Sequence, residues 1–291
     1  MLDKSSYSIS LGNTHQDGII SSTGMDRYNV KVSADTKLTS NWSSGFTANY
    51  ITTSIDKAVT SGNGLLRTVY AAPPSYDLAG IPSHVDGNQY AQNSFRGSFD
   101  NAYWAMENNE FTEETNRFFG NVYASYQTDF GTTNHKLNAK YMVGVDAYTT
   151  HYVDSYGYGS NTGGGRGQIE NYGWTNATYN SLLTINYDWR INEDWGLNAV
   201  VGNEIIQSNR KKYYEYGTNY NFAGWNHINN ATTQLTEEER WKNRTVGFFG
   251  NISASYRNML YLTLTGRQDY VSNMPRKNRS FFYPSISAGL S

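Results

Sequence analysis

The most constraining stretch of the sequence runs from Thr245 to Asp269 and has the pattern of two long strands joined by a tight turn near Asn258. Apolar and polar residues alternate in both arms, a period of two that only a half-buried strand explains. Each arm runs about ten residues, and a tilted strand needs roughly 9 to 11 residues to cross a bilayer. The stretch therefore predicts a hairpin of a transmembrane β-barrel. Its apolar positions are Val246, Phe248, Ile252, Ala254, Tyr256, Leu260, Leu262 and Leu264.

The composition suits such a barrel and excludes several other classes. Charged residues make up only 16% of the chain, while aromatic residues reach 15%, with 25 Tyr and 7 Trp. Amphipathic rings of this kind anchor barrels at membrane interfaces, although Tyr also favours strands in general. The net charge of -2 and the lack of a basic cluster interleaved with aromatics argue against a nucleic-acid partner. The absence of cysteine excludes disulfides and thiolate chemistry.

The same alternation predicts ten strands along the chain. Between them, one helical turn is predicted at 236–242, because Thr236 and Glu239 have the spacing of a capping box. The predicted strands are 5–14, 28–38, 42–53, 118–128, 135–152, 172–190, 196–213, the two arms within 245–269, and 281–290.

The predicted connections alternate between short and long. The short ones are 39–41, 130–134, 190–195 and the turn near 258, and the long ones are 16–24, 54–116, 153–171, 214–243 and 271–279. Short periplasmic turns opposite long extracellular loops are the asymmetry of outer-membrane barrels. A soluble sandwich has no reason to place its long loops at one end, and a propeller would show a repeat that is absent here. The predicted fold class is therefore all-β, an antiparallel transmembrane β-barrel segment.

Three stretches of the sequence carry a family resemblance. They are AAPPSYDLAG at 71–80, FDNAYW at 99–104 followed by NRFFGNVYASY at 116–126, and GRQDYVSN at 266–273 with FFYPSISAGLS at 281–291. In this order they resemble the barrel of SusC-like (SusC/RagA) TonB-dependent outer-membrane transporters. The family usually has DNPYW where this chain has Ala102, so one motif departs from the pattern.

The resemblance implies a domain assignment and a function. Residues 1–291 would form part of the transporter barrel, an internal fragment without signal peptide, TonB box, plug domain or C-terminal strands. The barrel would lie in the bacterial outer membrane, in contact with outer-membrane lipid, and would have no cofactor and no enzymatic activity. It would import glycans, oligosaccharides or peptides with a SusD-like lipoprotein and the TonB complex. The alternative is an outer-membrane or secreted all-β hydrolase acting on carbohydrate, with loop Asp and Glu residues as catalysts.

The candidate substrate-binding residues are aromatic and polar side chains of the predicted long loops. Flat rings can stack on the apolar faces of sugars, and carboxylates or amides can bind the hydroxyl groups. The alternative role for these residues is to pack the loops or to form the outer aromatic girdle. The candidates are Tyr76, Asp100, Asn101, Tyr103, Trp104 and Trp225.

Other polar residues are not expected to form a site. Arg267 and Asp269 are two positions apart on one strand face, which predicts an ion pair within the wall. The five histidines lack paired metal-ligand spacing, so no metal site is predicted. No catalytic residue is predicted either.

Overall fold

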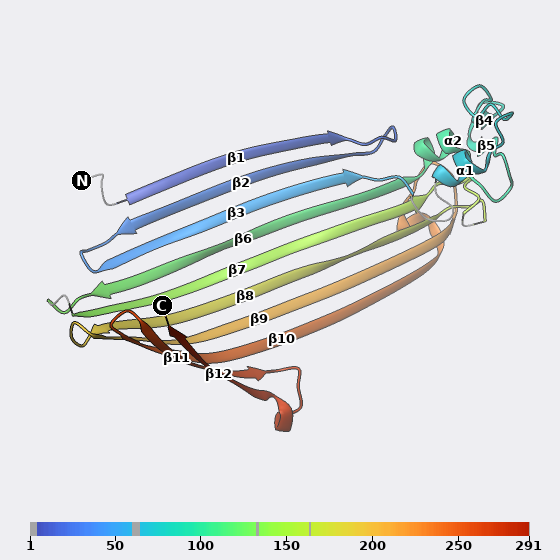
Figure 1. Cartoon of the computed structure of the whole chain (residues 1–291). Coiled ribbons are helices and arrows are strands. Elements are labelled where there is room, and N and C mark those ends of the chain that lie inside the picture. Colours follow the sequence, from blue (N-terminus) through green and yellow to red (C-terminus); the bar gives the residue numbers. More distant parts are fainter. Residues whose placement is uncertain (1–4, 60–64, 132–133, 163, 291) are drawn as a thin grey trace.

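The computed structural model describes residues 5–59, 65–131, 134–162 and 164–290, and it consists mainly of one antiparallel sheet (Figure 1). Ten strands pair in the order β1-β2-β3-β6-β7-β8-β9-β10-β11-β12, and β4 and β5 form a separate small hairpin. The predicted fold class and the ten long strands are confirmed. The sheet strands are β1 (Ser5–Asp17), β2 (Gly24–Lys37), β3 (Trp42–Asp56), β6 (Glu110–Thr128), β7 (His135–Tyr156), β8 (Gln168–Arg190), β9 (Trp195–Tyr220), β10 (Ala231–Tyr256), β11 (Leu260–Val271) and β12 (Ser280–Leu290).

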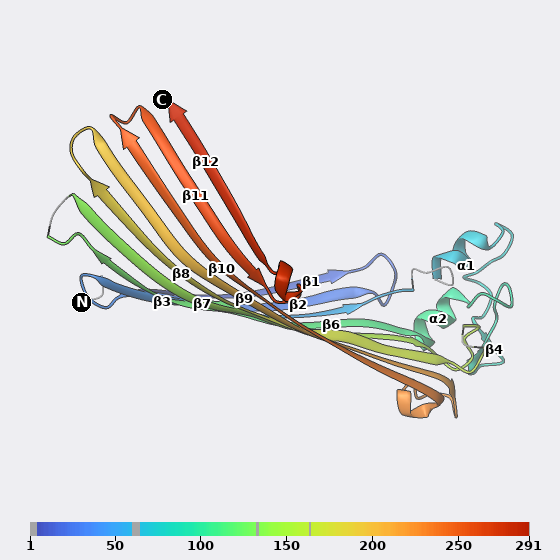
Figure 2. The same cartoon turned by 90° about the horizontal axis from the view of Figure 1, so that it is seen from below.

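The remaining elements lie in the connections at one end of the sheet. The connection between β3 and β6 contains α1 (Leu65–Ala71), β4 (His84–Val85), β5 (Asn88–Gln92) and α2 (Ala102–Asn108). Figure 2 shows that the sheet curls, and that α1 and α2 lie on the concave side, toward which β11 and β12 bend. The short helix η2 (Ile228–Asn230) lies on the convex side. No helix in the described part of the chain is long and apolar enough to cross a membrane.

Strand register assigns every side chain to one of the two faces, because residues directly opposite each other share a face. On the convex face, Leu264 lies between Ile252 of β10 and Ile286 of β12, and these three apolar side chains are largely exposed. On the concave face, the hydroxyl groups of Ser253 and Thr263 share a hydrogen bond of 2.9 Å. The structure therefore confirms the predicted alternation: one face of the sheet carries an apolar belt and the opposite, inner face is polar.

The strands are longer than predicted. β9 and β10 each have 26 residues, so they pair far beyond the apolar belt. The prediction of an irregular segment at 214–243 with a helical turn at 236–242 is wrong, because Glu237 pairs with Tyr214 and Glu239 with Lys212 in a continuous ladder. This part of β10 is exposed on both faces and shows no apolar alternation. Cross-strand ion pairs such as Lys211 with Glu238 (2.7 Å) replace it.

The connections confirm the predicted alternation of short turns and long loops. The long loops are shorter than predicted. The connections 38–41, 129–134, 191–194 and 257–259 lie at one end of the sheet, called here the short-turn end. Those at 57–109, 157–167, 221–230 and 272–279 lie at the other, called the loop end. The connection 18–23, also at the loop end, was predicted to be long but is no longer than 129–134, because β1 and β2 extend further than the apolar pattern does.

Candidate functional site

The inner face carries an array of aromatic rings in its loop-side half. Tyr152 of β7 lies opposite Tyr172 of β8, and Tyr172 lies opposite Tyr214 of β9. The rings of Tyr152 and Tyr172 are stacked, with centroids 4.8 Å apart and planes within 6°. The Trp174 ring lies 5.6 Å from that of Tyr152. Together with Trp241 of β10, these residues form a surface that we call the aromatic wall: Tyr152, Tyr172, Trp174, Tyr214 and Trp241.

Basic side chains lie over the rings of the aromatic wall. The Lys57 ammonium is 4.6 Å from the centroid of Tyr152 and 3.4 Å from the carboxylate of Glu113. The Arg210 guanidinium is 5.1 Å from the Trp174 centroid and 5.6 Å from that of Trp241. Cation–π contacts of this kind are worth about 0.5–1 kcal/mol at exposed sites, so they hold the rings in place without covering them completely.

Burial and nearby carboxylates raise the pKa values of the phenols on this surface. The Tyr172 hydroxyl donates to Asp154 Oδ2 at 3.0 Å, and burial, followed by this hydrogen bond, raises the pKa of Tyr172. Burial and then the charge of Glu113 raise the pKa of Tyr152. Burial and then the charge of Glu170 raise the pKa of Tyr214. The Tyr172 hydroxyl is already hydrogen-bonded to Asp154, so this residue offers a ligand mainly its ring.

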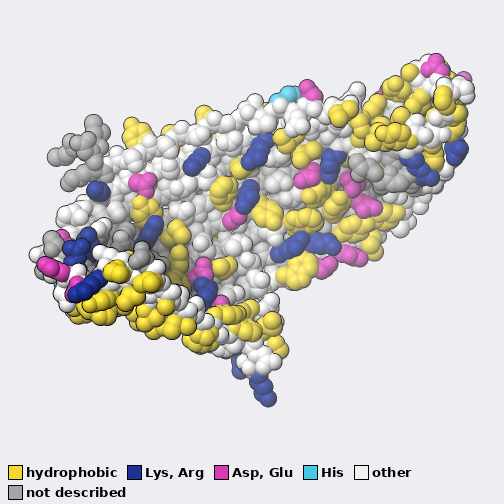
Figure 3. Space-filling model, in the orientation of Figure 1, with side chains coloured by type: hydrophobic (Ala, Val, Ile, Leu, Met, Phe, Trp, Pro, Cys, Tyr) yellow, Lys and Arg dark blue, Asp and Glu magenta, His cyan; other side chains and the backbone are white. Residues whose placement is uncertain are grey.

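The chemistry of this surface suits contact with a ligand. Figure 3 shows the concave face, where hydrophobic side chains and charges of both signs gather over the loop-side half of the strands. Half-buried rings can stack on the apolar face of a sugar or on a peptide side chain, and nearby charged groups can bind polar substituents. No cluster of three or more His, Asp or Glu residues in the described part of the chain could hold a metal ion.

Three of the six sequence-predicted site residues lie buried at the start of α2. Asp100 accepts hydrogen bonds from Gln92 Nε2, Ser160 Oγ and the Asn161 amide at 2.6–2.7 Å. Asn101 caps α2 by accepting from the amides of Tyr103 and Trp104. The indole of Trp104 is fully buried and donates to the Gln89 carbonyl (2.9 Å). These contacts match the alternative role, in which Asp100, Asn101 and Trp104 pack the loops.

The other three candidates are accessible, but the structure does not bring them together as one site. Tyr103 is 43% exposed on α2, and Tyr76 packs edge-on against Phe95 in the same connection. Trp225, 44% exposed, belongs to the connection 221–230 and is nearly parallel to the rings of Phe222 and His227. Ligand contact by Tyr76, Tyr103 and Trp225 stays a prediction.

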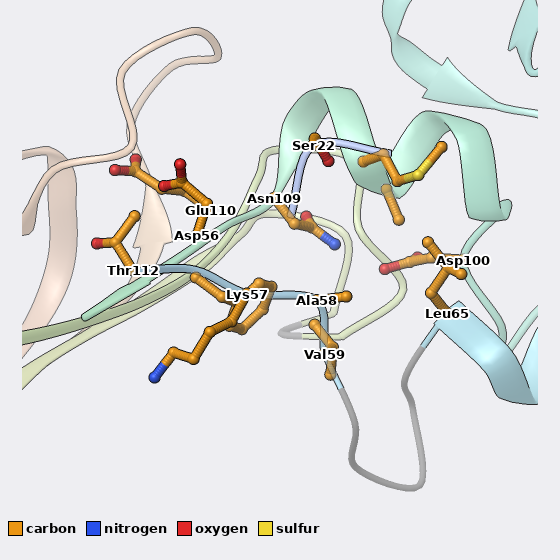
Figure 4. A pocket seen from close by; sticks show the side chains of 13 residues that line it. Ser22, Asp56, Lys57, Ala58, Val59, Leu65, Asp100, Asn109, Glu110 and Thr112 are labelled. Carbon is orange, nitrogen blue, oxygen red and sulfur yellow. The ribbon is translucent and has the colours of Figure 1, made fainter. Parts of the chain in front are cut away.

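A small pocket joins the loop end to the inner face. It measures about 130 Å³ and lies between the end of β3, the start of β6 and the two helices (Figure 4). Asp56, Lys57, Leu65, Asp100 and Asn109 are among its lining residues. Lys57 thus lines the pocket and also lies over the Tyr152 ring, so the pocket borders one edge of the aromatic wall.

Sequence reasoning missed the aromatic wall because it searched the loops for rings. The signal was present in strand parity: Tyr152 shares the inward parity of Lys136, Asn138 and Lys140 on β7. Tyr172 and Trp174 share a parity on β8 in the same way. Rings at inward positions, where a barrel normally has polar side chains, would have identified the surface.

Comparisons with known proteins agree with this architecture. No family model matches the chain. TonB-dependent receptor P26 of Formosa agariphila is 26% identical over 310 residues, which cover 97% of this chain and 28% of the receptor. TonB-dependent receptor SusC of Bacteroides thetaiotaomicron is 24% identical over 97% of this chain and 29% of its own length. The structure of the RagAB peptide importer in its "closed-closed" state superposes with a TM-score of 0.76 at 16% identity, over 98% of this chain and 32% of that one.

The fold and these comparisons define a class: the sheet has the architecture of a TonB-dependent receptor barrel. Within that class, the chain is similar in sequence to the TonB-dependent receptor SusC and in fold to the RagAB peptide importer. The relatives are named as receptors and transporters, not as enzymes. The chain spans less than a third of the length of the curated relatives that it matches.

Proposed function

We propose that this chain forms part of the wall of an outer-membrane TonB-dependent importer of glycans, oligosaccharides or peptides. The observation that carries the proposal is the division of one sheet into two faces. The outward face is an apolar belt, and the inward face is polar with an aromatic wall toward the loop end. Lipid would contact the first face and cargo the second, on its way from the loop end through the lumen.

The outward belt favours this function over the alternative of a secreted carbohydrate hydrolase. Leu11, Ile286 and Leu290 are each more than 70% exposed, and they lie on the same face as Ile252 and Leu262. A continuous apolar surface of this extent is not left in water by a soluble enzyme. We therefore do not propose hydrolase activity for this chain. We do propose that it lies in the bacterial outer membrane.

The proposal includes two protein partners and a direction. The long connections would face the outside of the cell and meet a SusD-like lipoprotein, while the short turns would face the periplasm, where TonB supplies energy. The similarity to SusC and to the RagAB importer supports both partners. Residues 1–291 would be barrel wall and loops in this assembly.

The test compares two aromatic substitutions on one strand. Tyr172→Ala removes a ring from the inner face of β8, whereas Tyr179→Ala removes an outward ring that is 48% exposed. In the full-length protein, uptake and binding of labelled malto-oligosaccharides and of labelled oligopeptides are measured for each variant. Removing one stacking ring should weaken binding of the transported class about tenfold or less, on the order of 0.5–1.5 kcal/mol. Equal effects of the two variants, or uptake that persists without TonB, would contradict the proposal.

A further inference from the structure

A band of basic side chains lies on the outward face, directly beyond the apolar belt at the loop end. Val246 and Arg244 are two positions apart on β10 and therefore share the outward face. Lys242 and Arg240 follow at the same parity, and Arg240 lies opposite Lys211 of β9. Each of these four side chains is exposed. The belt thus ends in a cationic rim, and not in the neutral polar residues that cover most of the inner face.

The adjoining connection between β11 and β12 extends this band. The Ser272 amide donates to the Arg244 carbonyl at 2.8 Å, and the Arg244 amide donates to Ser272 Oγ at 2.7 Å. The connection therefore starts beside the rim, and it carries the short helix η3 (Arg276–Asn278). Figure 3 shows basic side chains protruding where Figure 1 places η3. We define the basic band as Lys211, Arg240, Lys242, Arg244, Arg276, Lys277 and Arg279.

Internal ion pairs leave this band strongly positive. Lys211 (2.7 Å) and Arg240 (2.6 Å) share a single carboxylate, that of Glu238. At the outward positions from 207 to 213 and from 238 to 244, and in the connection 272–279, Glu238 is the sole carboxylate among the described residues. The inner face of the same two strands is different, because Lys212 faces Glu239 (3.6 Å) and Arg210 lies between two indole rings. On these two stretches the outward positions hold four basic residues and one carboxylate, whereas the inward positions hold two basic residues and one carboxylate.

The lower edge of the band lies at the height of lipid headgroups. A strand rises about 3.4 Å per residue, so Arg244 lies roughly 7 Å along β10 beyond Val246. A barrel strand is tilted by about 35–45°, which reduces this to about 5 Å above the apolar belt. The headgroup zone on each side of the hydrocarbon core is roughly 5–7 Å deep. Arg244 therefore lies at the depth of lipid phosphates. Lys242 lies about 10 Å and Arg240 about 16 Å above the belt, and the long flexible stem of Lys242 lets its ammonium reach back toward the phosphates.

We propose that the basic band binds the phosphate groups of an anionic lipid in the leaflet on the loop side of the barrel. This inference rests on the proposed membrane placement. The lipid's acyl chains pack on the outward belt at Val246 and Ile205, and its phosphates pair with Arg244 and Lys242. Positive charge on the edge of a sheet also discourages pairing with other chains. That role does not apply to Lys211, because β9 is paired there on both sides, with β8 and with β10.

The experiment removes two charges from the outward face of β10 or two charges from the inward face of its neighbour β9. The outward variant is Lys242→Gln with Arg244→Gln, and the matched inward control is Lys212→Gln with Arg210→Gln. Each full-length protein, in neutral detergent, is titrated with phosphatidylglycerol and, separately, with zwitterionic phosphatidylcholine, and native mass spectrometry counts bound lipid. Inorganic phosphate is added as a competitor in a third arm, and circular dichroism establishes that each variant is folded.

We expect the outward variant to bind phosphatidylglycerol about 25-fold more weakly, at roughly fivefold for each cation near an anionic surface. Its binding of phosphatidylcholine and the lipid binding of the inward control should stay unchanged, and free phosphate should not compete. Unchanged phosphatidylglycerol binding in the outward variant, an equal loss in the inward control, or full competition by inorganic phosphate would overturn the proposal. Failure of the unsubstituted protein to bind either lipid would instead contradict the membrane placement itself.

Discussion

At the scale of single residues, the parity of a position along its strand decides which solvent a side chain meets. Leu262 points outward and is 45% exposed, while the next residue, Thr263, points inward and shares a hydrogen bond with Ser253. Leu262→Arg should destabilise the folded barrel by roughly 2–4 kcal/mol if the residue lies near the membrane midplane. Thr263→Arg should cost far less, because its new charge reaches the water-filled lumen. Membrane-folding titrations of the two variants measure the difference, and equal costs would disprove the assignment of faces.

Tyr220 allows a second test at this scale. Its ring is fully buried in a cluster with Ile169 and Ala231, and burial raises the pKa of Tyr220 to about 12, against a smaller opposite effect of the hydrogen bond with Ser155. Because the folded pKa lies above the unfolded value of about 10, the neutral phenol stabilises the fold fully below pH 10. This contribution is lost as the pH rises from about 10 to about 12. The difference between tyrosinate titrations of the unsubstituted protein and Tyr220→Phe should show one group titrating near 12, and titration near 10 would contradict the burial.

At the scale of elements, the sequence predicted the strands where the outward face is apolar and missed their extensions where neither face is apolar. The apolar alternation of 245–269 and 135–152 marks one face of each strand, so the strands there and their facing were predictable. The pairing of β9 with β10 beyond the belt depends on contacts such as Lys212 with Glu239, which no local pattern reveals. The buried roles of Asp100 and Asn101 were unpredictable for the same reason. Asp100 binds Ser160, which is distant in sequence, and Asn101 binds Gln92, which belongs to β5.

The capping of α2 gives a prediction for the loop end. Asn101 accepts from the amides of Tyr103 (3.0 Å) and Trp104 (3.3 Å), and its Nδ2 donates to the Asn93 carbonyl at 2.9 Å. Asn101→Ala should weaken the local structure of 84–108 by about 1 kcal/mol for the lost cap alone. Asn101→Asp, which keeps the cap acceptor, should lose less. Hydrogen exchange should accelerate in 84–108 and stay unchanged in β7 and β8, and acceleration throughout the sheet would contradict a local role.

The two ends of the sheet should differ in accessibility from outside the cell. Residues 1–291 contain no cysteine, so one introduced cysteine gives an unambiguous label site once any cysteine elsewhere in the full-length protein is replaced. Asn229→Cys lies in the exposed connection 221–230 at the loop end, and Glu193→Cys lies in the exposed turn 191–194 at the short-turn end. In intact cells making the full-length protein, a membrane-impermeant maleimide should label the first site at once and the second only after permeabilisation. The reverse pattern would invert the proposed topology.

At the scale of the whole molecule, the sheet is open in the described structure, with β1 and β12 at its two edges. Unpaired backbone amides and carbonyls cost several kcal/mol each in hydrocarbon, so an open sheet is not a stable membrane state. In water, the same edges and the apolar belt favour association between copies. We therefore expect residues 1–291 alone to form no monodisperse barrel in detergent. A heat-modifiable, protease-resistant monomer on a gel would contradict this and indicate that β1 closes onto β12.

The central claim is that one face of this sheet lies in lipid and the other in water, and a spin-label scan along β11 tests it most directly. Single cysteines at 260–265 of the full-length protein in a bilayer are labelled one at a time, and the accessibility of each to oxygen and to a water-soluble nickel complex is measured. The register predicts strict alternation: oxygen should dominate at 260, 262 and 264, and the nickel complex at 261, 263 and 265. Uniform accessibility along the strand, or alternation with the opposite phase, would contradict the account.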